Sequence, residues 1–262
     1  MLTLYHNDMS LCAQKVRLCL AEKGLEWESR HLVLRAGEHQ QSWYRALNRR
    51  AVVPTLVDGE KTIPESNVIL EYLDESRPQP ALAPKDPYGR AKMRLWTKQL
   101  DEDVHDASAA ILSFGIAFRH QYLERGQLGK KMLEEIPNVF KRERRRDVIE
   151  NGTNSKHFVV AVQRMVLLLD EMEEALAGQR WLAGDYTLAD VAFTPYLARL
   201  EHLDLLGMLE GRHRVADWYD RCKARASFRE AIVKWENADY LGLMRRHGAA
   251  SWPRVREIMQ AR

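Results

Sequence analysis

The feature that most constrains this chain of 262 residues is the stretch from Val52 to Ser66. Two short runs of strand-forming residues flank Asp58 and Gly59. Asp-Gly between such runs is typical of a tight β-hairpin, because both residues tolerate positive φ. Pro64 ends the second run, and an apolar pattern with helical spacing follows Ser66. The stretch therefore predicts a strand, a turn, a second strand and a helix.

Both ends of this stretch have chemistry that suits a small anionic peptide. Pro54 has no N–H, and the Val53-Pro54 bond can be cis at a cost of only about 0.5–1 kcal/mol, which would turn the backbone of Val53 towards an extended ligand. The helix that begins at Glu65 and Ser66 offers free amides and the positive end of its dipole, which suit a carboxylate. We expect such a peptide to lie along Val53 with its acidic end at Ser66.

The passage resembles the glutathione-binding half of the glutathione transferases, whose thioredoxin-like domain has a cis-proline at the start of its third strand. The resemblance implies that Val53 and Pro54 contact the cysteinyl backbone of glutathione and that Glu65 and Ser66 hold its γ-glutamyl end. On this passage alone, a simple hairpin and helix in another α/β protein is the alternative.

The resemblance also extends to His39, which stands in a polar segment before the hairpin. In the family this position contacts the glycyl carboxylate of glutathione, and a histidine can do so as a hydrogen-bond donor. A histidine at the surface without a ligand is the alternative.

A second candidate site begins at Ser10. The chain opens with a strand-forming run, and helical periodicity begins directly after this serine, so Ser10 lies at a helix N-terminus, where a serine often serves only as a cap. The segment from Ser10 to Arg17 resembles that of the serine-type glutathione transferases, in which the hydroxyl donates to the glutathione sulfur. A hydroxyl donor and a helix N-terminus both favour thiolate over thiol, so the resemblance implies that Ser10 is catalytic. Cys12 is a competing candidate, and Cys19 is expected in the core.

A proline-rich run at 77–87 separates two halves of different character. Strand signals end before it, and helical spacing dominates after it, notably over 91–120 and 158–177. We expect a glutathione transferase fold: an α/β thioredoxin-like domain at 1–76, the linker, and an all-helical domain for the second substrate at 88–262. Thr187 and Asp190 stand at the spacing of a capping box ahead of an apolar helix.

Composition excludes several classes of function. The net charge is only +3, from 40 basic and 37 acidic residues, which argues against nucleic acid or a membrane surface as partner. The basic run 141–146 lacks interleaved aromatic residues and is interpreted as a solvated helix face. Three scattered cysteines, with no paired histidine motif, predict neither a disulfide framework nor a metal site. No apolar run is long enough to span a membrane, and no signal peptide is evident, so a cytoplasmic protein is expected.

The resemblance implies a glutathione transferase that uses glutathione as co-substrate and attacks a hydrophobic, aromatic electrophile with the Ser10-stabilised thiolate. The segments 93–98 and 141–146 resemble those of the bacterial β-etherases, which implies cleavage of a β-aryl ether. A homodimer is implied as well. The alternative is a binding or scaffolding protein of the same fold. Residues that helical spacing offers to the second substrate, and that could equally belong to the core, are Trp96, Ser113, Phe114, Phe118 and Tyr122.

Overall fold

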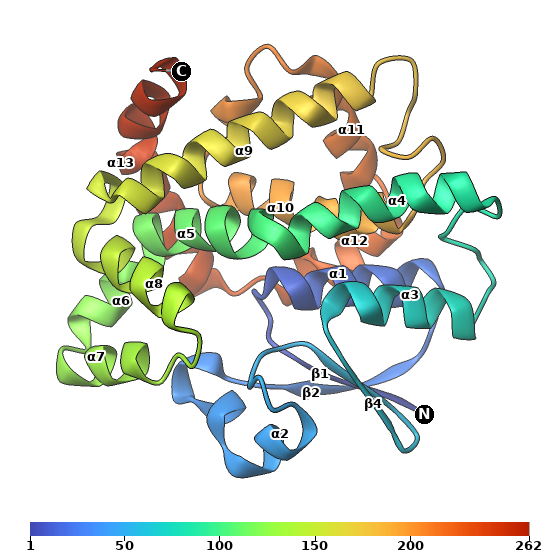
Figure 1. Ribbon diagram of the computed structural model, residues 1–262, viewed down its shortest axis with the longest axis horizontal. Helices are drawn as coiled ribbons and strands as arrows, with labels where there is room; N and C mark the ends of the chain where they lie inside the picture. The colour runs from blue at the N-terminus through green and yellow to red at the C-terminus, as the bar shows by residue number, and fades with distance from the viewer. Residues whose placement is uncertain (262) are drawn as a thin grey trace. The chain divides into compact units, whose positions relative to one another are not determined.

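The computed structural model describes residues 1–261, which form two compact units (Figure 1). Unit 1 comprises residues 1–97, 180–195 and 218–237. Unit 2 comprises residues 98–179, 196–217 and 238–261. Each unit is therefore assembled from segments that lie far apart in the chain.

Unit 1 is built on a four-stranded sheet with the order β2-β1-β3-β4. β1 runs parallel to β2 and antiparallel to β3, and β3 runs antiparallel to β4. Residues alternate between the two faces of β1, and its buried positions are Leu2, Leu4 and His6. The four strands are β1 (Leu2–His6), β2 (Trp27–His31), β3 (Thr55–Asp58) and β4 (Lys61–Pro64).

The predicted hairpin is confirmed, but its turn lies one residue later than expected. Asp58 pairs with Lys61, so the turn consists of Gly59 and Glu60, and only Gly59 has a positive φ, at 61°. Asp58 remains in β3 with its carboxylate fixed, because the Tyr72 hydroxyl donates to it at 2.8 Å. A glycine at the first turn position is typical of a type II′ hairpin.

Helices cover both faces of this sheet. Figure 1 shows α1 and α3 on one face and α2 on the other. Tyr44 of α2 is fully buried, and its ring lies 6.0 Å from that of Tyr5 on β1. The helical elements of this part of the chain are α1 (Leu11–Glu22), η1 (Leu34–Ala36), η2 (Glu38–Gln40), α2 (Ser42–Leu47), α3 (Ser66–Ser76) and α4 (Pro87–Gln99).

Segments from the second half of the chain complete unit 1. The predicted capping box is present: the Thr187 N–H donates to Asp190 at 2.9 Å, and the Ala189 N–H donates to the Thr187 hydroxyl. The same carboxylate accepts from the Leu182 N–H and from the indole of buried Trp218, at 3.0 and 2.8 Å. Burial raises the pKa of Asp190 to about 6 in spite of these hydrogen bonds. The later helices that unit 1 contains wholly or in part are α10 (Leu188–His202), α11 (His213–Lys223), α12 (Ala226–Ala231) and η7 (Val233–Trp235).

Unit 2 is helical. The predicted helix over 91–120 is confirmed as a continuous run, but the stretches 100–109 and 114–118 have π-helical bonding, which side-chain periodicity does not foresee. The Ser108 hydroxyl donates to the Ala161 carbonyl and ties this run to α9. The elements are η3 (Leu100–Ala109), α5 (Ala110–Ser113), η4 (Phe114–Phe118), α6 (Arg119–Glu124), α7 (Gln127–Glu134), α8 (Val139–Asn151), η5 (Gly152–Asn154), α9 (Lys156–Ala175), η6 (Leu206–Leu209) and α13 (Ala238–Gln260).

The sequence did not predict α13. Gly248 and Pro253 interrupt its pattern, and both residues normally count against a helix interior. Gly248 is needed for close packing, since a Cβ atom there would lie 1.6 Å from the Leu203 carbonyl oxygen. Tertiary contact therefore outweighs local propensity in this helix.

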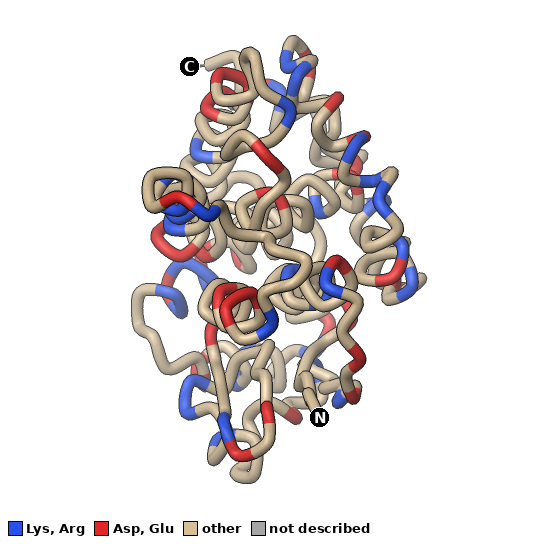
Figure 2. Tube along the Cα trace, turned by 90° about the vertical axis from the view of Figure 1, so that its right-hand side faces the viewer, with Lys and Arg blue, Asp and Glu red and all other residues tan. Residues whose placement is uncertain are grey.

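The interpretation of 141–146 as a solvated face is wrong for one residue. Arg146 is partly exposed and forms ion pairs with Glu134 and Glu143, whereas Arg145 is only 8% exposed. Arg145 can turn inward because its guanidinium lies on the Phe114 ring, 3.3 Å from the ring centroid. Elsewhere, basic and acidic positions are interspersed along the chain (Figure 2).

Residues 1–261 have neither a membrane-spanning helix nor a cluster of metal-binding side chains. No helix there has the length and apolar character that a membrane crossing requires. No group of His, Cys, Asp and Glu side chains in this part of the chain is arranged to hold a metal ion.

Candidate functional site

The register of the sheet brings five of the six predicted site residues, all except His39, to one edge of unit 1. Tyr5 near the end of β1 pairs with Thr55 at the start of β3, and Thr55 pairs with Pro64 at the end of β4. The segments just beyond these positions carry Ser10, the Val53-Pro54 bond and the Glu65-Ser66 pair. Residues that are up to 56 positions apart in the sequence thus meet at this edge.

Ser10 is the N-cap of α1, as its position predicts. Its hydroxyl oxygen accepts from the Ala13 N–H at 3.3 Å, and the residue is half-buried. A hydroxyl has one proton to donate besides the lone pairs with which it accepts, so capping leaves the Ser10 proton available to a ligand. The first turn of α1 has no acidic residue, so the positive end of the helix dipole is not neutralised there. This corner can stabilise an anion.

The backbone beside Pro54 is open. The Val53-Pro54 bond is cis, which was the geometry considered from the sequence. Among residues 1–261 no hydrogen bond is formed by the N–H or C=O of Val53. The neighbouring Val52 carbonyl is fixed, since it accepts from the Tyr44 hydroxyl at 2.7 Å and from the Asn48 amide at 3.0 Å. Val53 can therefore pair with an extended peptide from a fixed position.

The N-terminus of α3 is also open. Its N-cap residue, Glu65, has φ of +69° and ψ of 114°, and its side chain makes no capping hydrogen bond. The carboxylate turns instead to Arg50, at 2.6 Å. Ser66 is 6% exposed and begins the helix, whose first-turn amides have no capping side chain within the described structure. Left-handed backbone at a non-glycine residue is uncommon and is often found at ligand sites.

Two residues hold the starts of α1 and α3 together, and sequence reasoning missed them. The Lys15 ammonium donates to the Asn67 side-chain oxygen at 2.9 Å, and the Asn67 amide donates to the Thr97 carbonyl at 3.0 Å. Both side chains are almost fully buried. A lysine inside an apolar helical stripe was the available signal, because a buried ammonium needs a partner.

The two remaining candidates on these segments differ in position. Cys12 is half-buried in the first turn of α1, close in sequence to Ser10. His39 is half-buried in η2, on the connection between β2 and α2. Cys19 is fully buried, as expected, and burial raises the pKa of its thiol.

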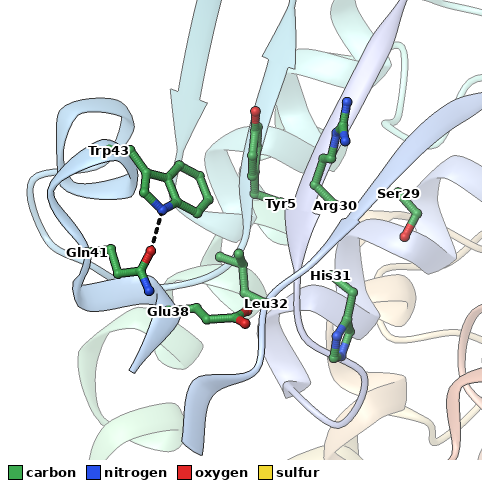
Figure 3. Close-up of a pocket in the computed structure, with 8 residues that line it drawn as sticks. All are labelled: Tyr5, Ser29, Arg30, His31, Leu32, Glu38, Gln41 and Trp43. Carbon is green, nitrogen blue, oxygen red and sulfur yellow. Dashed lines mark hydrogen bonds between the residues drawn. The ribbon is translucent and has the colours of Figure 1, made fainter. Parts of the chain in front are cut away.

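A pocket of about 400 Å³ lies next to the His39 segment and contains none of the predicted site residues. In Figure 3 it is lined by β1, by β2 and by the segment that leads into α2, where the Trp43 indole donates to Gln41 at 2.6 Å. Its lining residues are Tyr5, Ser29, Arg30, His31, Leu32, Glu38, Gln41 and Trp43. The open backbone groups of Val53 and α3 therefore form a site separate from this pocket.

Two protein-family models identify the family to which this chain belongs. Residues 9–76 match the model of the glutathione S-transferase N-terminal domain, and residues 132–221 match that of the C-terminal domain. The chain belongs to the glutathione transferase family. The expected fold, with a small mixed sheet followed by a mostly helical part, is confirmed. Glutathione is the co-substrate of this family.

Relatives of this chain include enzymes that act on aromatic compounds. The tetrachloro-p-hydroquinone reductive dehalogenase of Sphingobium chlorophenolicum is 29% identical, over 88% of this chain and 95% of the relative. Protein LigF of a Sphingobium strain is 27% identical, over 92% and 96% of the two chains. The crystal structure of the β-etherase LigF superposes with a TM-score of 0.78 at 25% identity and covers 89% of this chain and 99% of that one.

The open groups described above can each bind one part of a small peptide. The unpaired Val53 backbone can accept an extended peptide, the uncapped start of α3 can accept a carboxylate, and Ser10 has a proton for a sulfur atom. The second-substrate candidates separate in the structure. Ser113 is a core residue that donates to Ala109 and accepts from Arg199, whereas half-buried Phe114, Phe118 and Tyr122 lie together in unit 2.

Proposed function

We propose that this protein is a transferase that displaces a leaving group from an aromatic electrophile with the thiolate of glutathione. The observation that carries this proposal is the Ser10 hydroxyl at the start of α1, at the sheet edge that also holds the open backbone of Val53 and the open end of α3. In the proposed reaction the thiol proton leaves to solvent. The sulfur then forms a bond to carbon, and an aryloxide or halide departs with its electron pair.

Each site residue has a proposed part in binding. The Val53 N–H and C=O pair with the cysteinyl unit, and Pro54 keeps that segment out of the sheet ladder. The start of α3 at Ser66 receives the γ-glutamyl carboxylate, and Glu65 holds the ammonium of the same unit. His39 donates to the glycyl carboxylate. Ser10 donates to the sulfur and lowers the free energy of the thiolate relative to the thiol.

The relatives support an aromatic second substrate. LigF is named a β-etherase and the dehalogenase acts on a chlorinated hydroquinone, and both are similar to this chain over most of its length. We therefore propose β-aryl ether cleavage or aryl halide displacement, with the second substrate held by residues of 88–262 and glutathione by residues of 1–76. We also propose that the protein is cytoplasmic and forms a homodimer.

The test is to replace Ser10 and separate its two roles. Ser10→Ala removes both the hydroxyl donor and the cap, whereas Ser10→Gly removes the donor but costs only a few tenths of a kcal/mol as a cap. Both variants are expected to lower kcat/KM with an aryl β-ether or a halogenated nitrobenzene by about tenfold or more, the equivalent of one pKa unit. Only Ser10→Ala is expected to lower the unfolding temperature clearly.

Two other results would contradict the proposal. If Cys12→Ser abolished turnover while both Ser10 variants remained active, the thiol would be the catalytic group. If glutathione failed to raise the unfolding temperature of the wild-type protein at millimolar concentration and no electrophile was consumed, the protein would be a scaffold of the same fold.

A further inference from the structure

Arg145 is a buried cation that the proposed transfer of glutathione does not use. It lies in the middle of α8, in unit 2, and is 8% exposed although three of its neighbours in the run 141–146 are also arginines. Burial lowers the pKa of its guanidinium below the usual range. A buried charge of this kind is costly unless an opposite charge or a hydrogen-bond acceptor accompanies it.

The described part of the protein gives Arg145 no such partner. No hydrogen bond or ion pair is formed by its guanidinium within residues 1–261, and its Nε is buried without an acceptor. Asp106 is a carboxylate whose charge interacts with that of Arg145, and it is already paired with Lys141 at 2.7 Å. The other buried arginine of this region, Arg199, already donates to the Ser113 hydroxyl at 3.0 Å. Arg145 thus lacks the kind of acceptor that Arg199 has.

One aromatic ring lies on this cation, and other rings pack in sequence beside that ring. The guanidinium lies 3.3 Å from the centroid of the Phe114 ring. That ring packs against Phe118 at 5.4 Å and against Tyr122 at 5.8 Å, and Phe118 packs against Tyr240 of α13 at 6.0 Å. All four rings are only half-buried, so together they present an apolar aromatic surface with a positive charge beneath one end. This combination matches an aromatic molecule that carries a carboxylate.

We propose that the preferred electrophile is an aromatic acid, whose ring packs on Phe114, Phe118 and Tyr122 and whose carboxylate pairs with Arg145. The inference rests on the proposed function, since it names the class of electrophile for that reaction. A guanidinium binds a carboxylate in a bidentate manner and does so most strongly where water is excluded. Arg145 is then a binding and specificity residue, and the displacement itself remains with glutathione and Ser10.

The experiment compares a charged electrophile, 4-chloro-3-nitrobenzoate, with its uncharged methyl ester. Each kcat/KM is divided by the rate constant of the uncatalysed reaction with glutathione, which removes the difference in intrinsic reactivity. The wild-type protein is expected to prefer the acid by about tenfold or more, the usual effect of a charged hydrogen bond. Arg145→Gln is expected to abolish that preference, mainly by raising KM for the acid, and to leave the ester unaffected within about twofold.

Arg146→Gln is the matched control, since it removes the same charge from the next residue of the same helix but from an exposed ion pair. It should keep the preference for the acid. Arg145→Lys retains the charge without the planar fork of the guanidinium and should keep part of the preference for the acid. This variant replaces Arg145→Gln in the test if the glutamine variant does not fold. The inference would be overturned if the wild-type protein showed no preference for the acid. It would also be overturned if Arg145→Gln lowered kcat/KM equally for the acid and the ester.

A binding measurement separates this inference from the proposed function. Titration calorimetry with 3-nitrobenzoate and its methyl ester, which lack a leaving group, reports affinity without turnover. Tenfold tighter binding of the acid that depends on Arg145, together with no consumption of either chloro compound, would refute the displacement reaction and retain the acid site. Turnover of both chloro compounds with equal affinities for the two unreactive ligands would refute the acid site alone.

Discussion

The Lys15 ammonium lies 2.9 Å from the side-chain oxygen of Asn67, and this contact joins the helix that begins at Ser10 to the helix that begins at Ser66. Both side chains are buried, at 1% and 8% exposure. The two helix N-termini that we propose to hold the sulfur and the γ-glutamyl end of glutathione are therefore held at a fixed separation by this internal contact.

Asn67→Leu should destabilise the protein more than Lys15→Met does. The leucine leaves a buried ammonium short of an acceptor, which costs about 1–3 kcal/mol, whereas the methionine replaces the cation with an apolar group of similar length. Urea unfolding of the two variants and of the double variant forms a mutant cycle. A double variant no more destabilised than Asn67→Leu alone is expected, and strict additivity of the two losses would show that the contact contributes nothing.

Glu65→Gln should weaken the binding of glutathione by about tenfold or more, because the proposed pair between this carboxylate and the γ-glutamyl ammonium is charge-assisted. Stability should change by less than about 0.5 kcal/mol, since the ion pair of Glu65 with Arg50 is partly exposed. Calorimetry with reduced glutathione measures the affinity. Glu60→Gln, in the exposed hairpin turn, is the control, and an affinity equal in both variants would remove Glu65 from the site.

Asp190→Ala should lower the free energy of unfolding by more than about 3 kcal/mol. Three buried donors would lose their acceptor, at about 1–3 kcal/mol each. These donors are the N–H groups of Leu182 and Thr187 and the Trp218 indole. Asp185→Ala, in the same loop but exposed, should change stability little. Equal losses in the two variants, measured by chemical unfolding, would show that the cap is not what stabilises this loop.

Stability should fall on mild acidification because His6 is buried in its neutral form. Burial, and then the nearby Arg17 charge, lower the pKa of His6 to about 3. The unfolded chain binds a proton at His6 near pH 6.5, whereas the folded protein does not. The contribution of neutral His6 to stability is therefore complete above pH 6.5 and is lost as the pH falls towards 3. Between pH 7 and 5.5 the loss is about 1 kcal/mol. His6→Gln cannot titrate and should show a pH dependence shallower by that amount, whereas parallel curves would contradict the assignment.

The sequence predicted those elements whose signals are local. A proline, an Asp-Gly pair and a serine before an apolar helix fix their own backbone, so the hairpin and the starts of α1 and α3 were found close to their true positions. The turn moved by one residue because side chains distant in sequence hold Asp58 in its strand. The local turn pattern contains no sign that Tyr72, 14 positions later, is the hydrogen-bond partner of Asp58.

The missed features depend on contacts between distant segments. Arg145 stands in a run that is otherwise polar, and only the Phe114 ring, 31 positions earlier, makes its burial possible. Lys15 depends in the same way on Asn67. The helix α13 contains a glycine and a proline that local propensity counts as breaks, and the Leu203 carbonyl that requires the glycine lies 45 positions earlier. The open backbone of Val53, by contrast, could be expected from its proline alone.

Unit 1 takes segments from three parts of the chain, and this sets an order for biosynthesis. Arg17 donates to the Ala231 carbonyl at 2.8 Å, and Glu22 accepts from Arg225 at 2.6 Å. Both partners leave the ribosome more than 200 residues after the helix that needs them. Arg17 can already donate to the Asn7 and Asp8 carbonyls, but it lacks Ala231, and half-buried Glu22 lacks Arg225, until nearly the whole polypeptide has been translated. A truncated message that ends before residue 225 would yield a chain in which the first-made helix never acquires its last neighbours.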